Sequence, residues 1–299
     1  MSSAEISVFA RPNDRLRRRK LVGRGVELIA WFAAAMGVAV LGVLVGYVAE
    51  RGASQLSLDL FIKSQAAAFS VTSASQGLAN AFVGSLVLIG IATAMAVPVG
   101  ILIAIYVSEF APRSVKPVVN LVLDLVAGIP AIVVSIFIYG LIEVGHGQTG
   151  LAVSYAVAVI MLPFVARSTI EILALVPNSL REAALGLGAP RWRTTLGVVL
   201  PQTLGGILTG TVLAVARVSG ETAPPLVLSY VVSQGVAWNP VHALQTVPLA
   251  IYELGESGTP SDTALAWAGA FVLIMFILVV SLSARWFAAR SRRKLGGSR

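Results

Sequence analysis

Six long runs of apolar residues decide what this chain of 299 residues can fold into. An α-helix needs about 20 residues to cross the hydrocarbon core of a bilayer, and each run is close to this length or exceeds it. Only 12% of the residues are charged, whereas a soluble domain carries about 25%. We therefore predict an all-α membrane protein with six transmembrane helices. The runs are residues 26–49, 80–107, 118–142, 150–166, 202–220 and 263–289.

The first run follows a basic segment and is itself 24 residues long. The apolar part of a cleaved signal peptide has about 7–15 residues, so we predict a retained transmembrane helix at 26–49. We expect a basic cytoplasmic tail at 1–25 before it and an outer loop at 50–78 after it. A second basic cytoplasmic tail is expected at 291–299.

Proline and small residues mark the later runs. Gly128 and Pro130 lie near the start of the third run, and Pro163 lies close to the predicted end of the fourth. Small residues also recur at every fourth position in two runs, a spacing that lets membrane helices pack closely. These residues are Ala92, Ala96, Gly100 and Ala104 in the second run and Gly206 and Gly210 in the fifth.

The distribution of basic residues predicts the orientation. With both termini inside, the inner segments hold nineteen of the 22 Lys and Arg residues and the outer segments hold only Arg51 and Lys63. Basic residues concentrate on the cytoplasmic side of membrane proteins, so we predict a multi-pass membrane protein with both termini cytoplasmic. The net charge of +8 is interpreted as this concentration of basic residues on the cytoplasmic side. Membrane lipids are expected partners, and no nucleic acid partner is expected.

Residues 171–201 carry the most informative local pattern. Ser179-Leu180-Arg181-Glu182 fits a capping box, in which the serine caps a helix and the glutamate reaches back. Gly188 suits the left-handed position after the helix, and Pro190 follows where a helix cannot continue. We predict a short cytoplasmic helix, a sharp turn and a second helix that leads into the membrane. On spacing alone, Glu182 as a simple cap and the segment as an ordinary connection remain open.

The same segment resembles the EAA loop of ABC importer permeases. The resemblance rests on Glu182-Ala183-Ala184, then Gly188, then Val198-x-Leu200-Pro201, with valine in place of the more usual isoleucine. It implies that the short helix is a coupling helix, which docks in a groove of an ATPase subunit. The residues that it assigns to this coupling are Glu182, Ala183, Ala184 and Gly188.

The chain lacks the residues that nucleotide or metal chemistry needs. A Walker A loop requires lysine directly after glycine, and no lysine here follows a glycine. We therefore predict no catalytic residue and no cofactor in this chain, with ATP and Mg²⁺ bound by a separate ATPase subunit. There is no cysteine and there are only two histidines, so no metal site is expected unless carboxylates complete one.

Arg217 is a charged residue inside the fifth run, sixteen residues after Pro201. At about 1.5 Å per residue it lies about 24 Å along that helix, in the outer part of the bilayer. Glu221 follows four positions later, so the two can pair on one helical face. Two interpretations remain open from position alone. Arg217 is either a structural or snorkelling residue, or an anion site whose guanidinium binds a phosphate-like oxyanion.

A longer stretch, about 79–290, resembles the phosphate importer permeases of the PstA/PstC group. The matching motifs are residues 97–101, 106–109, 127–133 and 216–224, the last reading Ala-Arg-Val-Ser-Gly-Glu-Thr-Ala-Pro. The resemblance implies a type I ABC importer permease domain at 79–290. It also implies that Arg217, Ser219, Glu221 and Thr222 bind phosphate. The short tail and the first run look more like PstA than PstC.

Three departures from the family pattern concern the site. Ala131 stands where the family often has serine, so no hydroxyl is available there. Val218-Ser219 replaces a commoner Ala-Ile before Gly220, and Pro224-Pro225 doubles a usual single proline. The first departure leaves the full ligand set of the anion site open, and the others alter the outer end of the helix.

The resemblance also implies a location, the bacterial inner membrane, and a set of partners. They are an ATPase subunit dimer, a second homologous permease of the PstC kind and an outer phosphate-binding protein, for which residues 224–262, with Trp238, offer a docking surface. Transport of another oxyanion, sulfate or molybdate, remains an alternative, and so does an ATP-independent secondary transporter. A protease-like Gly-x-Ser-Gly string at 255–258 lies in a polar segment, and no histidine lies in any run, so we interpret it as chance.

Overall fold

The computed structural model describes residues 14–65, 76–230 and 235–296, and the chain divides into two units, residues 1–50 and 51–299. In the first unit, α1 (Asp14–Ala53) begins twelve residues before the predicted start at 26. Arginine and lysine favour helix, so the helix continues into the basic segment that flanks the apolar run. The first part of the predicted tail, residues 1–13, and residues 66–75 of the predicted outer loop lie outside the described residues.

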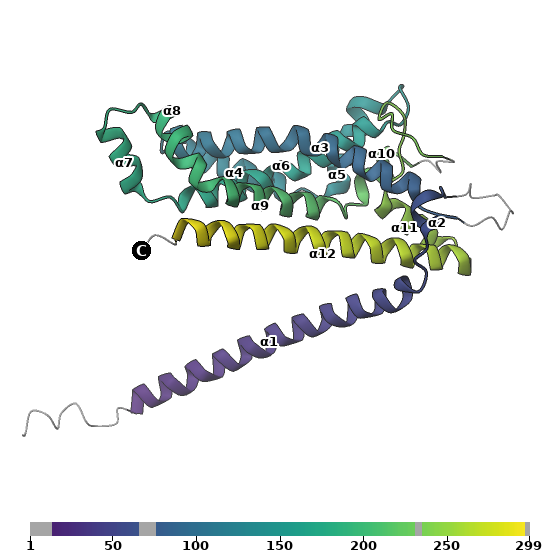
Figure 1. Cartoon of the computed structure of the whole chain (residues 1–299), viewed down its shortest axis with the longest axis horizontal. Helices are drawn as coiled ribbons and strands as arrows, with labels where there is room; N and C mark the ends of the chain where they lie inside the picture. The colour runs from purple at the N-terminus through teal and green to yellow at the C-terminus, as the bar shows by residue number, and fades with distance from the viewer. Residues whose placement is uncertain (1–13, 66–75, 231–234, 297–299) are drawn as a thin grey trace, which may run out of the picture. The chain divides into compact units, whose positions relative to one another are not determined.

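Long helices dominate the second unit as well, as Figure 1 shows. They are α3 (Ala79–Ile105) continued by the π-helical turn η2 (Tyr106–Phe110), α6 (Gly150–Ala174), and α12 (Pro260–Gly296). A further continuous helix consists of α8 (Arg191–Thr194), the π-helical η4 (Thr195–Val199) and α9 (Leu200–Val218). In the described part of the chain, these four and α1 are long and apolar enough to cross a membrane.

The third apolar run is not one helix, contrary to the prediction. It forms α4 (Val115–Gly128) and α5 (Ala131–Ile138), continued by the π-helical η3 (Tyr139–Glu143), with a bend of 92° between them. Pro130 causes the break, because proline has no N–H to donate and pushes the preceding residue to extended backbone. Ile129 is indeed extended, with ψ of 129°. The described residues therefore contain five helices that are long and apolar enough to span a membrane, or six such spans if this bent pair counts as one.

The predicted end of the fourth run, residue 166, is also wrong. The helix α6 continues to Ala174, so Pro163 lies inside it and Arg167 is a helical residue instead of a loop residue. The length of an apolar run corresponds to the thickness of the hydrocarbon core, whereas the helix that contains the run can continue beyond the core into polar surroundings. For the same reason α12 extends to Gly296, beyond the predicted 289.

The small residues pack as predicted. Ala92, Ala96 and Ala104 on α3 are at most 2% exposed, and α6 lies against this face. A Cβ atom added to Gly100 would lie 2.9 Å from Val165 Cγ1, and one added to Gly206 would lie 2.7 Å from Ile172 Cγ2. Both contacts are closer than side chains normally allow. The central helix α6 thus contacts α3 on one side and α9 on another through backbone-close packing.

Three short helices lie at the other end of the second unit from α7, which is described below (Figure 1). They are α2 (Leu58–Ile62), α10 (Ala223–Leu228) and α11 (Val247–Glu256), and none was predicted from the sequence. Two of them, α10 and α11, overlap the segment 224–262, the docking surface expected from the sequence. Residues 231–234 of this segment lie outside the described residues. Pro224, Pro225 and Pro248 stand in their first turns, where a missing N–H costs nothing.

Candidate functional site

The segment 171–201 contains the short helix that the sequence predicts, but it starts differently. α7 (Asn178–Gly186) has Pro177 at its N-cap and no side-chain capping bond. The predicted capping box is therefore wrong: Ser179 already lies within the first turn. Proline fixes its own φ and lacks a donor, which suits the start of a helix without a serine cap. Glu182 is exposed and does not serve as a cap, so its carboxylate faces solvent.

The end of α7 follows the prediction. Gly188 has φ of +85°, in the left-handed region. The N–H of Ala189 donates to Ala184 O at 3.1 Å and the N–H of Gly188 donates to Leu185 O at 2.9 Å. This pair of bonds is the Schellman arrangement, which satisfies the last carbonyls of a helix. Pro190 follows, and α8 starts at Arg191 in the direction of the membrane helix α9.

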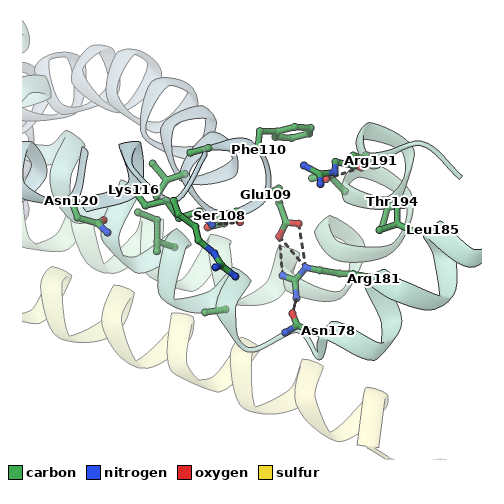
Figure 2. Close-up of a pocket in the computed structure, with 16 residues that line it drawn as sticks. Ser108, Glu109, Phe110, Lys116, Asn120, Asn178, Arg181, Leu185, Arg191 and Thr194 are labelled. Atoms are coloured by element: carbon green, nitrogen blue, oxygen red, sulfur yellow. Dashed lines mark hydrogen bonds and ion pairs between the residues drawn. The ribbon is translucent and has the colours of Figure 1, made fainter. Parts of the chain in front are cut away.

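One arginine fastens α7 to the helices beside it (Figure 2). Arg181 Nη2 donates to Glu109 Oε1 at 2.8 Å, and its Nε lies 3.2 Å from Oε2 of the same carboxylate. The guanidinium also donates to Val176 O at 2.6 Å and to Leu173 O at 2.9 Å. These carbonyls lie at the C-terminal end of α6, where backbone acceptors lack helical partners. Arg181 therefore joins α7, α6 and η2.

The Arg181–Glu109 pair is largely removed from solvent. The side chain of Arg181 is 19% exposed and that of Glu109 is 10% exposed. A buried pair of this kind depends on satisfied hydrogen bonds, because each charge has lost its hydration. Here the arginine fork makes three hydrogen bonds to the carboxylate and two to backbone carbonyls, so the charge is well compensated. The pair is a fixed connection between the end of α3 and the coupling helix predicted from the sequence.

Arg217 lies in the last turn of α9 and is exposed. Its guanidinium carbon is 4.2 Å from the centre of the Phe164 ring, a cation–π contact. The predicted ion pair with Glu221 is wrong, since no such pair occurs among the residues that the structure describes. α9 ends at Val218, and the chain then turns, so the helical i, i+4 relation does not reach Glu221. Within the described residues, Arg217 therefore has no carboxylate at ion-pair distance.

Ser219 faces another region than Arg217. Its hydroxyl donates to Val215 O at 2.8 Å and is buried. It lines a cavity of about 390 Å³ together with apolar side chains such as Phe82, Phe276 and Val272. Arg217, Glu221 and Thr222 are not among the lining residues of this cavity. The four predicted anion-site residues are close together in the sequence, but they do not line one common cavity.

Comparison with known proteins places these elements in a family. A family model described as a binding-protein-dependent transport system inner membrane component matches residues 96–293. The chain belongs to this family. The match includes α7, the Arg181–Glu109 pair and Arg217.

Relatives of these inner membrane components extend the match to nearly the whole chain. The phosphate transport system permease protein PstA of Pasteurella multocida is 34% identical over 92% of this chain and 97% of its own length. That of Xylella fastidiosa, strain Temecula1, is 37% identical over 92% of this chain and 96% of its own length. PstA 1 of Mycobacterium tuberculosis, strain H37Rv, is 37% identical over 73% of this chain and 72% of its length.

Solved importer structures share the fold of this family member. A bacterial ABC transporter for the import of alginate superimposes with a TM-score of 0.56 at 18% identity, covering 93% of this chain and 97% of that one. The MetNI methionine ABC transporter in an inward-facing conformation gives 0.55 at 18% identity, covering 70% and 91%. The predicted fold, that of a type I ABC importer permease, is confirmed.

Sequence reasoning missed two ion pairs in this permease. The first is Arg181–Glu109, and the second joins Arg167 of α6 to Asp124 of α4. Arg167 Nη2 also donates to Asn120 O at 2.9 Å. An available signal was overlooked: an acidic residue in or next to an apolar run needs a cationic partner, and Glu109 lies just after the second run while Asp124 lies within the third.

A buried polar network at the end of the permease away from α7 orders the segment before α11. Asn80 Nδ2 donates to Gln245 Oε1 at 2.7 Å, and Gln245 Nε2 donates to Glu253 Oε2 at 2.6 Å. Gln65 N in turn donates to Asn80 Oδ1 at 3.2 Å. Burial raises the pKa of Glu253 to about 7, and the hydrogen bond from Gln245 offsets only part of this rise. The carboxyl therefore titrates near neutral pH.

We expect Glu253→Gln to flatten the dependence of stability on pH. A carboxyl with a raised pKa in the folded state stabilises the fold below its unfolded pKa of about 4.5, and this contribution is lost as the pH rises through about 7. At pH 8 the variant should be more stable by about 1 kcal/mol, a value discounted for solvent screening. Thermal unfolding in detergent at pH 5.5 and pH 8 measures this. Glu256→Gln, exposed on the same helix, is the control, and equal pH profiles for wild type and Glu253→Gln would contradict the assignment.

Proposed function

We propose that this chain is a membrane-spanning permease subunit of an ATP-driven importer that moves inorganic phosphate into the cytoplasm. The observation that carries the proposal is the likeness to PstA permeases over 92% of the chain, at 34% and 37% identity. The long apolar helices supply the membrane domain. The exposed coupling helix supplies a contact for an energy-providing partner.

The proposed partners follow from what the chain presents and lacks. α7 has no buried residue, and Leu187 at its end is 89% exposed. An exposed apolar side chain beside Ala183 and Ala184 suits insertion into a groove of an ATPase subunit. We propose a dimer of such subunits, which bind ATP and Mg²⁺, a second permease of the PstC kind and an outer phosphate-binding protein.

The proposed phosphate contact is Arg217, with Ser219, Glu221 and Thr222 as further candidates. An exposed guanidinium without a carboxylate partner can offer two parallel donors to a phosphate oxygen pair. Its cation–π contact with Phe164 holds the group in place without neutralising it. Glu221, half-buried nearby in the chain, would limit the affinity for an anion, and a transporter must release its cargo.

Reconstitution tests the function directly. The chain is placed in proteoliposomes with a PstC-type permease, the ATPase subunit and the binding protein. We expect uptake of radioactive phosphate that requires ATP and all four components. Excess sulfate or molybdate should not reduce this uptake. Uptake without the ATPase would identify a secondary transporter instead. Equal inhibition by sulfate or molybdate would identify another oxyanion as the cargo.

Both termini are proposed to lie in the cytoplasm, on the side of α7. The basis is the concentration of Lys and Arg in the tails and in the segments predicted to be inside. A phosphatase reporter, which is active only outside the inner membrane, should be inactive when fused after Arg299 and active when inserted at Gly147. The reverse pattern would overturn the orientation. A cytoplasm-active reporter at the same two sites provides the control.

Gly188→Val is expected to uncouple ATP hydrolysis from transport. A side chain at φ of +85° costs at least about 1–2 kcal/mol, so the turn after α7 should change and the docking surface with it. Phosphate uptake should fall about tenfold, while basal ATPase activity of the assembled complex remains. Gly186→Val is the matched control, because Gly186 also has open space around its Cβ position but no positive φ.

Glu182→Lys should have a similar effect on coupling through its charge. Its carboxylate is exposed, so the substitution should not disturb the fold of α7. Normal uptake by both Glu182→Lys and Gly188→Val would reject α7 as the coupling helix.

A further inference from the structure

A polar pocket of about 610 Å³ lies beneath the coupling helix (Figure 2). Its walls come from η2 and the loop after it, from the start of α4, from the end of α6 and from α7, α8 and η4. We propose that this pocket is a binding site for a phosphate group at the inner end of the permease, separate from the transport pathway. The proposal does not depend on phosphate being the cargo.

The charge of the lining favours an anion. Four cationic side chains, Arg113, Lys116, Arg181 and Arg191, line the pocket, against one carboxylate, Glu109. Glu109 is already bound by Arg181. The nearby carboxylate of Asp124 is already paired with Arg167 on the adjoining helix faces.

Three cationic groups are therefore left over. Within the described part of the chain, Arg113, Lys116 and Arg191 have no carboxylate within ion-pair distance. Lys116 Nζ donates to Ser108 O at 3.1 Å, which places its charge on the pocket wall and leaves two of its protons for a ligand. Like charges held around one cavity repel each other, and a bound anion removes this repulsion.

Three neutral polar side chains of the wall, Ser108, Asn120 and Asn178, keep hydrogen-bond donors for a ligand. Asn120 and Asn178 accept hydrogen bonds from Arg167 and Arg181 through their carbonyl oxygens, so their NH₂ groups remain as donors. The buried hydroxyl of Ser108 makes no hydrogen bond in the described structure. A lining of arginine, lysine, amide NH₂ and hydroxyl groups matches the several acceptor oxygens of a phosphate group.

Two sources can supply such a group at this position. One is the headgroup of an anionic phospholipid, because the start of α4 continues directly into exposed apolar residues such as Val118 and Leu121. The other is inorganic phosphate in the cytoplasm. A ligand here would contact both the α4 start and α8, so its occupancy would stiffen the support of the coupling helix.

The test compares two arginines that lie two positions apart on α8. Arg191 lines the pocket, whereas Arg193 lies over the ring of Trp192 and does not line it. Arg191→Gln and Arg193→Gln remove the same charge. Both are made in the full chain that also carries Arg217→Ala, so that the proposed pathway contact cannot bind the probe. Arg113→Gln gives an independent second variant in an exposed loop, should Arg191→Gln fail to fold.

Two probes distinguish the sources. Inorganic phosphate is titrated onto the chain in phosphatidylcholine nanodiscs and followed by calorimetry. Phosphatidylglycerol and phosphatidylcholine are offered to the delipidated chain in detergent, and retained lipid is counted by native mass spectrometry. We expect Arg191→Gln and Arg113→Gln to weaken binding of one probe about tenfold, the effect of one charge-assisted hydrogen bond, and Arg193→Gln to leave it unchanged.

Each outcome has a defined meaning. Selective loss of inorganic phosphate identifies a site for the free ion, and selective loss of phosphatidylglycerol identifies a headgroup site; both support the proposal. Equal binding by the Arg191 and Arg193 variants, or no binding of either probe to the parent chain, overturns it. If neither probe binds but Arg191→Gln weakens capture of the ATPase subunit, the pocket is a protein contact and the proposal is likewise overturned.

Discussion

Arg217→Ala should reduce phosphate uptake by about 100-fold or more, the largest loss that we expect from any single substitution in this chain. Each hydrogen bond to a charged group contributes about 1.5–3 kcal/mol, and the guanidinium can give two to one phosphate. The side chain is exposed and has no carboxylate partner in the described structure, so its removal should not destabilise the fold. Uptake in proteoliposomes is measured beside complex assembly and basal ATPase activity, both of which should remain.

Three further variants separate binding from structure. Arg217→Lys keeps the charge but loses the planar fork, so it should transport poorly. Phe164→Leu removes only the ring beneath the guanidinium and should retain most uptake. If Phe164→Leu were as inactive as Arg217→Ala, the cation–π contact would be the function of Arg217. Full uptake by Arg217→Ala combined with Glu221→Ala would refute the anion site, since it would mean that only an unbalanced charge had been harmful.

Arg181→Met should uncouple the complex and destabilise its inner end. The substitution leaves Glu109, 10% exposed, without its partner, and breaking a buried ion pair in this way costs about 3 kcal/mol. It also removes the donors to Leu173 O and Val176 O. We expect uptake to fall by at least tenfold, together with a lower unfolding temperature and ATPase activity of the assembled complex that no longer drives uptake.

A double variant distinguishes a mechanical role of the pair from a purely stabilising one. Arg181→Met with Glu109→Gln removes both charges, so most of the lost stability should return because no buried charge remains unpaired. Uptake should stay low, since α7 is no longer fastened to η2. Recovery of uptake along with stability would show that the pair only stabilises the fold. Arg193→Met, an exposed arginine on the next helix, is the control and should behave as wild type.

Local rules predicted local structure well. Gly188 was assigned to the left-handed position from the residues around it, and its φ of +85° confirms the assignment. The capping box failed because the spacing of Ser179 and Glu182 fits a cap that the helix does not use: Pro177 lies at the N-cap and starts the helix without a serine cap. Apolar length identified the spanning helices, but it cannot detect the 92° bend, which depends on the backbone around Pro130.

Contacts between distant residues were beyond local rules. Glu109 and Arg181 are separated by 72 positions, and only the packing of α3 against α6 brings them together. The position of Arg217 in the last turn of α9 was predicted, but its neighbour was not. A four-residue spacing implies a pair only while the helix continues, and α9 ends one residue after Arg217.

The contacts of Arg181 also bear on the exchange of segments between permeases. Of the groups that hold Arg181, Leu173 O and Val176 O lie within residues 171–201, whereas the Glu109 carboxylate lies in a different helix. A chimera that received 171–201 from this chain would carry an arginine already bound to its own backbone but would need an acidic residue at the end of the recipient's second helix. The loop and that single side chain therefore form one transplantable unit, although the sequence separates them widely.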